Sequence, residues 1–570
     1  MFVNLLFSIL IFFVPLSFAG TEPWAFFIFQ ILTAFIFVYL LFTNKKFVFT
    51  LPALFVNSVF VIFILIAIVQ LLNHHTILQQ KNLIPFTVSP FHTLKELNSI
   101  FTYMLFFITV TQLFYKLDKI KKLLFLTLTV SAVVMSIGLC FPKGEYIKFF
   151  LGTESLGNFG SFTNRNNAGI FLSMSFFISL SLMFYNFFRY QKYLAENKKN
   201  KFIVIQIITI VVSVLLLISV ILTRSRGAMS ATFISIFVYS FLYAYHFSST
   251  YKQKFLKLSI ILFIMLLSSF VIYKNIDAIN AYSQRTTGMS EKTRLKLYDM
   301  SFNILKDYPV TGIGFAAFPI LTDKYLDEDL RAYPEYLHND WLELLLDAGY
   351  PVYIIFLLFI FMIIFCSLRR IKFLSYKKKI LFIGLFSACC SICIGSFVDF
   401  HFHIPANAML FFICLATLTS ISFYKDNKTF KFNNGFVLKS IYCLIIVCAL
   451  IFSYRNVMAW KCYTFSKNMP KEQEIEYLDK AVKLCGNPRY IENYIITVYN
   501  SAKTNKKEIF AKDGYLETIL YSYIEKYPYN KKISEVFKNI KNFQKNEQIK
   551  GDEDPVKDIE KKGSLYYNIL

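Results

Sequence analysis

Charged residues are scarce in this chain: Asp, Glu, Lys and Arg make up 17% of its 570 residues, whereas soluble globular proteins average about 25%. Hydrophobic residues reach 56%. The shortage of charge excludes a cytosolic enzyme with a fully solvated surface, and the apolar content excludes an intrinsically disordered chain. About 20 apolar residues cross a bilayer, so the chain is long enough for thirteen such spans and a soluble part.

Long apolar runs predict an all-α polytopic membrane protein with about thirteen transmembrane helices. The first run lacks the positively charged start of a signal peptide and is followed at once by a second, so we interpret it as a membrane helix. The runs fall at residues 2–18, 24–42, 52–72, 98–114, 123–140, 166–188, 202–222, 228–247, 258–273, 342–368, 380–398, 405–423 and 436–453.

Acidic residues are outnumbered by basic ones, 36 against 60, which gives a net charge of +24. The basic residues lie mainly in short loops between apolar runs, a pattern typical of membrane orientation, so we expect membrane lipids and no nucleic acid as partners. One set of alternate loops carries 24 Lys and Arg, and the opposite set of short loops carries 7. The positive-inside rule therefore predicts a cytoplasmic N-terminus, with residues 274–341 and 454–570 outside.

The end of the chain differs from the rest because it has no apolar run long enough to span. Apolar residues recur at helical spacing from Ile475 to Cys485 and stop at Gly486-Asn487-Pro488, and a second helix-to-proline pattern ends at Pro528. This resembles a tetratricopeptide-type helical hairpin. Whether Cys462 and Cys485 form a disulfide is left open by the sequence. The predicted domains are a transmembrane domain (1–453) with a large external loop (274–341), an external α-helical domain (454–545) and a flexible tail (546–570).

Two arginines break the charge rule, because Arg224 and Arg226 lie in the short external turn 223–227. A charge drawn below the membrane interface costs about 2.5–3.5 kcal/mol, so a compensating anion is expected. A diphosphate is a good candidate, since guanidinium groups match its oxygens bidentately. The alternative is that both arginines extend to lipid headgroups.

A histidine stands where the large loop meets the next span, in the sequence His338-Asn339-Asp340. Histidine titrates near neutral pH and can meet a substrate there, and Asp340 or Glu343 can hold its tautomer. The alternative is an ordinary helix start, in which Asn339 or Asp340 is the N-cap and His338 is a bystander.

Two further segments contain small or amide residues. Asn164 and Asn166 lie in the glycine- and asparagine-rich segment 157–169, which lets a backbone approach a polar ligand or simply forms a turn and an N-cap. The sequence Gly312-Ile313-Gly314 has no strand–helix context and no third glycine, so it predicts a close backbone turn and not a nucleotide site.

Asp399, His401 and His403 alternate along the chain, and in an extended segment they would project to one side. Metal binding is therefore an alternative, but no fourth ligand can be identified. We expect neither a metal ion nor another cofactor.

The order of these motifs resembles the bacterial O-antigen ligase/polymerase family of polytopic membrane glycosyltransferases. An external F-x-N-x-N-x-A patch is followed by S-R-G between two spans, then by P-x-x-G-I-G and H-N-D in the large loop. The resemblance covers roughly residues 150–425. Phe162–Ala168, His403–Asn407 and the helical tail are similar to a branch of the family with a tetratricopeptide-like C-terminal tail.

The resemblance implies a C-type membrane glycosyltransferase fold and metal-independent, inverting transfer from an undecaprenyl diphosphate donor. It implies catalytic roles for Arg226, which is the arginine of S-R-G, for Arg294 upstream of P-x-x-G-I-G, and for His338 of H-N-D. Implied substrate-binding residues are Arg224, Asn164, Asn166 and Asn339.

The sequence thus predicts a multi-pass protein of the bacterial inner membrane that transfers a lipid-linked glycan at the periplasmic face. The acceptor stays open between lipopolysaccharide core, a growing polysaccharide and protein, and the C-terminal domain is a candidate surface for a protein partner. A transporter or flippase of lipid-linked glycans is the alternative, but it would place polar residues within the spans. A non-catalytic scaffold would not need arginines and a histidine on one face.

Overall fold

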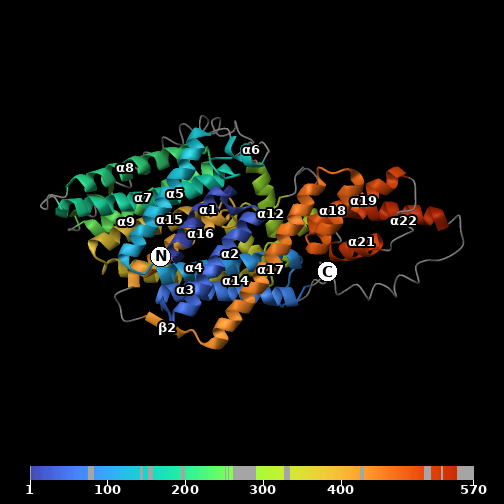
Figure 1. The fold of residues 1–570 in the computed structure, drawn as a ribbon, viewed down its shortest axis with the longest axis horizontal. Helices are drawn as coiled ribbons and strands as arrows, with labels where there is room; N and C mark the ends of the chain where they lie inside the picture. The colour runs from blue at the N-terminus through green and yellow to red at the C-terminus, as the bar shows by residue number, and fades with distance from the viewer. Residues whose placement is uncertain are drawn as a thin grey trace.

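The computed structural model describes residues 2–74, 83–141, 145–151, 158–193, 199–248, 291–325, 334–423, 429–505, 515–527 and 530–548, with seven further positions between 250 and 260. It is an all-α polytopic membrane protein, which confirms the predicted fold class. A helical body lies at one end of the molecule, and a smaller group of C-terminal helices lies at the other (Figure 1).

Helices make up nearly all of the regular structure. The body contains α1 (Phe2–Leu16), the 3₁₀ turn η1 (Phe18–Gly20), α2 (Pro23–Thr43), α3 (Leu51–Leu72), α4 (Pro90–Leu113), α5 (Leu117–Cys140), α6 (Glu145–Leu151), α7 (Arg165–Tyr193), α8 (Lys199–Leu222), α9 (Arg226–Phe247), α12 (Glu291–Asp307), α13 (Phe318–Tyr325), α14 (Asp340–Ile371), α15 (Tyr376–Gly395) and α16 (Pro405–Phe423). The C-terminal part contains α17 (Phe436–Ser466), α18 (Lys471–Leu484), α19 (Pro488–Asn505), α21 (Tyr515–Lys526) and α22 (Lys531–Gln548).

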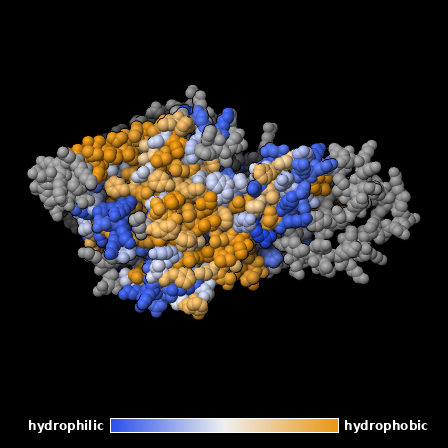
Figure 2. Space-filling model, viewed as in Figure 1, coloured by the Kyte–Doolittle hydropathy of each residue, from blue (hydrophilic) through white to orange (hydrophobic). Residues whose placement is uncertain are grey.

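Nine of the described helices are long and apolar enough to cross a membrane, and α1 and residues 405–421 of α16 are shorter apolar helices. Together with α4, they account for twelve of the thirteen predicted spans. The predicted span 258–273 lies almost wholly outside the described residues. Hydrophobic residues cover most of the visible face of the body, and hydrophilic residues gather at its margins and over the C-terminal helices (Figure 2).

Helix α7 is the most buried of the candidate membrane-spanning helices in the described part of the chain, with 83% of the residues in its most apolar stretch buried. Serines on α7 make short interhelical hydrogen bonds, from Ser173 to Ser391 on α15 (2.7 Å) and from Ser175 to Ser131 on α5 (2.7 Å). Small polar residues of this kind let apolar helices approach closely. The first residue of α7 therefore sits on a rigid, closely packed support.

One short sheet departs from the helical pattern. Strands β1 (Lys46–Thr50) and β2 (Thr429–Asn433) pair antiparallel and join the α2–α3 connection to the α16–α17 connection. Gln112 of α4 covers the outer edge of β1 through two hydrogen bonds to Val48 (2.9 and 3.1 Å). The sheet lies on the side that the charge rule assigns to the cytoplasm.

Helix α14 is broken at Gly349, which has a φ of 75°, just before Pro351. The break removes the helical partners of two carbonyl groups. Pro351 has no N–H for the carbonyl of Asp347, and the N–H of Tyr350 donates to the carbonyl of Pro309 (2.9 Å) instead of to that of Leu346. The glycine-rich turn supplies the replacements, since the N–H groups of Ile313 and Gly314 donate to the carbonyls of Leu346 (3.0 Å) and Asp347 (3.1 Å). The predicted close turn is thus confirmed, and it holds residues 340–348 of α14 against the α12–α13 segment.

We expect Gly349→Ala to destabilise the protein by about 2 kcal/mol or more, because a non-glycine residue at this φ is strained. An added Cβ would also lie 2.3 Å from the carbonyl oxygen of Val310. The matched control is Gly486→Ala, where no atom lies within 4 Å of the added Cβ. Thermal denaturation of both purified variants in detergent is the measurement, and equal melting temperatures would contradict this account.

The C-terminal helices form a second hydrophobic cluster, as the helical spacing predicted. Helix α17 runs unbroken through the predicted boundary at residue 453, and α18 ends one residue before Cys485. Cys462 and Cys485 both contact this cluster, and both are free thiols. Residues 549–570 of the predicted flexible tail lie outside the described residues.

Candidate functional site

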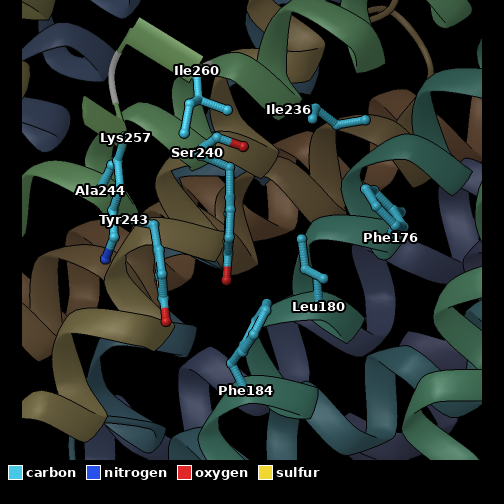
Figure 3. A pocket seen from close by; sticks show the side chains of 10 residues that line it. Phe176, Leu180, Phe184, Ile236, Ser240, Tyr243, Ala244, Lys257 and Ile260 are labelled. Atoms are coloured by element: carbon cyan, nitrogen blue, oxygen red, sulfur yellow. The ribbon is translucent and has the colours of Figure 1, made fainter. Parts of the chain in front are cut away.

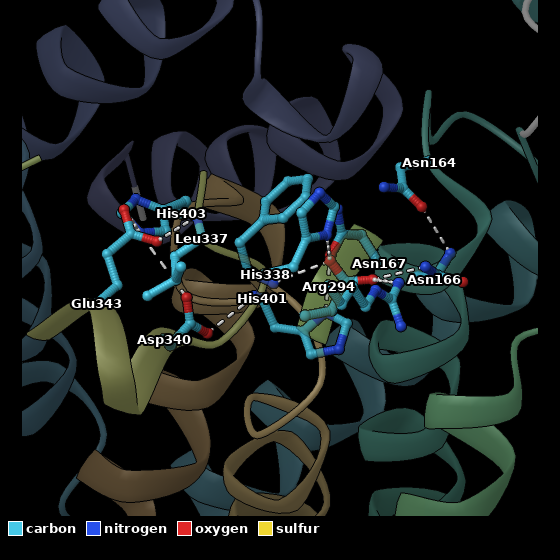
Figure 4. Close-up of polar contacts among 12 residues, drawn as sticks. Asn164, Asn166, Asn167, Arg294, Leu337, His338, Asp340, Glu343, His401 and His403 are labelled. Carbon is cyan, nitrogen blue, oxygen red and sulfur yellow. Dashed lines mark hydrogen bonds and ion pairs between the residues drawn. The ribbon is translucent and has the colours of Figure 1, made fainter. Parts of the chain in front are cut away.

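Apart from Arg224 and Arg226, the candidate site residues lie on three connecting segments and one helix. The segments are 164–167 at the start of α7, 335–339 before α14 and 396–404 between α15 and α16, with Arg294 on α12. Figure 4 shows His338, Arg294 and Asn166 converging from these elements. Segments far apart in the sequence therefore meet around one point.

His338 is held by a carboxylate from the opposite loop. Its Nδ1 lies 2.8 Å from Oδ1 of Asp399, and 14% of its side chain is exposed. Because a carboxylate only accepts hydrogen bonds, Nδ1 carries the proton and Nε2 is the acceptor nitrogen of the neutral ring. The expectation that Asp340 or Glu343 holds this ring was wrong, since both carboxylates bind other groups.

Asp399 contacts His338, Asn166 and Arg294 and is almost fully buried, with 3% of its side chain exposed. Its Oδ2 accepts a hydrogen bond from Nδ2 of Asn166 (2.5 Å) and lies 3.6 Å from Nη2 of Arg294. Burial alone would raise the pKa of Asp399, but the hydrogen bond with His338 and the charges of His401, His338 and Arg294 hold this pKa well below its usual value. Asp399 is therefore an anion throughout the neutral range.

Helix α12 orients two groups toward these loops from one face, because Arg294 and Tyr298 are four residues apart. The hydroxyl of Tyr298 donates to the carbonyl of His338 (3.0 Å) and lies 3.4 Å from that of Phe397. Tyr298 thus ties the histidine loop to the Asp399 loop. No signal in the sequence pointed to this tyrosine.

The alternating Asp399, His401 and His403 do not project to one side as an extended segment would. His401 turns into the core, where its Nδ1 lies 2.7 Å from Oδ1 of Asn167, and burial lowers its pKa to about 4. His403 faces Glu343 instead. Within the described part of the chain, no group of three or more His, Cys, Asp or Glu side chains is arranged to hold a metal ion. The arrangement of Asp399, His401 and His403 therefore does not support the alternative that they bind a metal ion together.

The turn that carries Arg224 and Arg226 lies beside the start of α7. A Cβ on Gly169 would come within 2.6 Å of the Cβ of Ala228, and one on Gly227 within 2.8 Å of Val398, the neighbour of Asp399. Arg226 is thus one residue away from a contact with the Asp399 loop.

Arg165 is a third arginine in this region, and it was not among the predicted site residues. Burial lowers the pKa of its side chain, and the charges of Arg224 and Arg226 lower that pKa further. Three guanidinium groups that repel one another form a surface suited to an anion. Arg165 also lies on the side with few basic residues, which is the signal that could have identified it.

The remaining predicted residues have local hydrogen bonds. Asn164 accepts from the backbone N–H of Asn166 (2.8 Å) through its side chain, which forms a turn at the start of α7. Asn339 is the N-cap of α14 and accepts from the N–H of Leu342 (3.1 Å), so its capping role is present. Asn166, in contrast, reaches directly to Asp399.

A cavity of about 430 Å³ lies between α7 and α9 and is lined mainly by apolar and aromatic side chains, among them Phe176, Phe184 and Tyr243 (Figure 3). Phe176 is eleven residues along α7 from Arg165, a distance of about 16 Å at 1.5 Å per residue. The cavity is therefore separate from the site around His338.

Residues 211–357 match the family model of the O-antigen ligase. This segment belongs to the O-antigen ligase family. The match covers Arg224, Arg226, Arg294 and His338, and it confirms the family predicted from the order of the motifs. No curated protein gives a significant match to the chain.

The O-antigen ligase segment is completed by residues outside it. Asp399, which holds His338, follows it in the chain, and Asn166 precedes it. The match does not reach the C-terminal helices, so their tetratricopeptide character stays a prediction. The family supports a role in membrane glycan transfer, and the site offers a carboxylate-oriented histidine beside several arginines.

Proposed function

We propose that this protein transfers a glycan from an undecaprenyl diphosphate donor to an acceptor hydroxyl at the periplasmic face of the bacterial inner membrane. The observation that carries the proposal is the His338–Asp399 pair (2.8 Å), which lies beside Arg294 and close to the turn of Arg226. An acceptor must lose a proton and a diphosphate must gain charge, and these groups suit the two tasks.

In the proposed reaction, the acceptor oxygen attacks C1 of the donor sugar from the face opposite the diphosphate. The new C–O bond forms as the bond from C1 to the diphosphate oxygen breaks, so the configuration inverts and the diphosphate leaves with the bonding electrons. The proton of the acceptor hydroxyl passes to Nε2 of His338, and Asp399 stabilises the imidazolium that forms. No metal ion takes part in this scheme.

The arginines bind the leaving group in this scheme. Negative charge grows on the diphosphate as it leaves, and fixed guanidinium groups stabilise that charge more in the transition state than in the ground state. Arg226 and Arg294 take this role, and Arg224, Asn164, Asn166 and Asn339 contribute to binding of the donor. In this scheme the C-terminal helices lie in the periplasm, where they can meet the acceptor or a protein partner.

A strain that lacks the gene tests the proposal. We expect the strain to accumulate lipid-linked glycan and to lose one surface glycan, with the acceptor class revealed by which one is lost. Unattached polymer indicates transfer to lipopolysaccharide core, single repeat units indicate polymerisation, and unmodified glycoprotein indicates transfer to protein. A plasmid copy should restore the glycan, and an unchanged glycan profile in the deletion strain would contradict the proposal.

A further inference from the structure

A second charged cluster lies next to the site and is not used by the proposed reaction. Nε2 of His403 is 3.3 Å from Oε1 of Glu343 and 3.7 Å from Oδ1 of Asp340. Glu343 is buried, with 2% of its side chain exposed, and 16% of the His403 side chain is exposed. Figure 4 shows this cluster on the other side of the loops from Arg294.

The other oxygen of Glu343 holds the histidine loop. Its Oε2 accepts a hydrogen bond from the backbone N–H of Leu337 (3.1 Å), the residue directly before His338. His338 itself has a φ of 58°, a conformation that a residue with a side chain adopts only when its neighbours are fixed. Glu343 fixes the residue before His338, and Tyr298 binds the carbonyl of His338.

Asp340 holds the other loop in the same manner. Its Oδ2 accepts hydrogen bonds from the backbone N–H groups of His401 (2.9 Å) and Phe402 (3.1 Å). The two carboxylates of α14 therefore fix both loops of the site, one carrying His338 and the other Asp399. Buried carboxylates require a nearby cation to stay ionised, and His403 faces both of them.

Aromatic packing links the two histidines. The Tyr336 ring lies against the ring of His403 (4.7 Å between centroids) and is stacked on Phe400 (4.5 Å). The His338 ring packs edge-on against the same Phe400 ring (4.7 Å). A displacement of the His403 ring would therefore displace Tyr336 and Phe400, and with them the ring of His338.

We propose that His403 is a positioning residue whose protonated ring pairs with Glu343 and lies beside Asp340, so that these two side chains keep His338 and Asp399 in place. The inference rests on the proposed function, because it concerns the residue assigned there as the base. Burial would lower the pKa of His403, but the charge and hydrogen bond of Glu343, together with Glu96 of α4 and Asp340, raise it to about 10. His403 is thus a permanent cation at neutral pH.

The test compares wild-type protein with His403→Gln, Glu343→Gln and the double variant, each reconstituted with lipid-linked glycan. We expect each single variant to lower kcat at least tenfold with a KM for the donor within about twofold of wild type. The double variant should recover most of kcat, because it removes the charge of Glu343 together with its cation, and the two amides can bond to each other and to the N–H of Leu337. His74→Gln is the control and should keep wild-type kcat, because this side chain is exposed and its Nδ1 lies 3.1 Å from the carbonyl oxygen of Leu71 in the helix before it.

Stability against pH gives a readout that does not depend on transfer. Because the pKa of His403 is raised, its stabilising effect is complete below the pKa of an unfolded histidine, about 6.5, and is lost as pH rises toward 10. The difference in melting temperature between wild type and His403→Gln should therefore shrink over this interval, as His403 loses its charge opposite Glu343, Asp340, Glu96 and Tyr336.

Two kinetic outcomes would overturn the inference. One is a His403→Gln variant with wild-type kcat, and the other is a double variant no more active than the poorer single variant. A constant melting-temperature difference between pH 6.5 and 10 would also contradict the charged state of His403. Absence of transfer in the wild type, with the pH-dependent difference intact, would instead count against the proposed function alone.

Discussion

His338→Ala should lower glycan transfer by about 10²–10⁴-fold, the usual contribution of a general base, without loss of donor binding. Asp399→Asn should have an effect in the same range, because its carboxylate sets the tautomer of His338 and stabilises the imidazolium. Groups that act as a unit are not additive. The double variant should therefore transfer glycan no more than about threefold more slowly than the poorer single variant.

The measurement is the initial rate of transfer in membranes that contain equal amounts of each variant. His74→Ala and His246→Ala are the matched controls, since His74 lies just after the end of α3 and His246 lies in the last turn of α9, and both should keep full activity. His75, a third histidine expected to be dispensable, lies outside the described residues. Full activity in His338→Ala would remove it from the mechanism, and additive losses would show that Asp399 acts through another group.

Arg226→Ala and Arg294→Ala should each reduce transfer by about 10²–10³-fold, the effect of removing one group that stabilises developing negative charge. Lysine should rescue poorly at both positions, because a point charge cannot replace a planar fork that binds two oxygens. At Arg294 the loss has a second cause, since this side chain also lies 3.6 Å from Asp399. Both variants should still insert into the membrane.

Arg369→Ala is the control for these variants. Arg369 lies near the opposite end of α14 from Asp340, roughly 40 Å away at 1.5 Å per residue, so its loss should leave transfer unchanged. Transfer rates are measured together with binding of the lipid diphosphate alone. Near-normal transfer by Arg226→Lys would show that the arginine acts as a simple charge or a headgroup contact and not as a bidentate ligand.

The helices of the body were predictable because each one depends on a local run of apolar residues. The close turn at Gly312 and Gly314 was predictable because it also depends on local residues. Both glycines have positive φ values, 64° and 101°, which glycine adopts easily. The break in α14 was not predicted. It depends on how the turn packs against Gly349, which only the folded chain shows.

The site was predictable only in part. His338, Arg226 and Arg294 lie in or beside short motifs that resemble those of the family, so the sequence indicated them as candidate site residues. Asp399 was considered only as a candidate metal ligand. Its hydrogen bond with His338 could not be predicted, because the two residues are 61 positions apart and the contact depends on the turn between α15 and α16. The alternation rule for an extended segment misplaced its neighbours, since residues 396–404 form turns instead of a strand.

The central claim is that this protein moves a glycan from a lipid diphosphate to an acceptor hydroxyl. Its most direct test is a reconstitution of the purified full chain in liposomes with an undecaprenyl diphosphate-linked glycan and candidate acceptors, with EDTA present. The account predicts that glycosylated acceptor and free undecaprenyl diphosphate appear in equal amounts, with inverted configuration at C1, and that His338→Ala abolishes both. Retained configuration, a requirement for added metal, or movement of intact lipid-linked glycan across the membrane without transfer would contradict it.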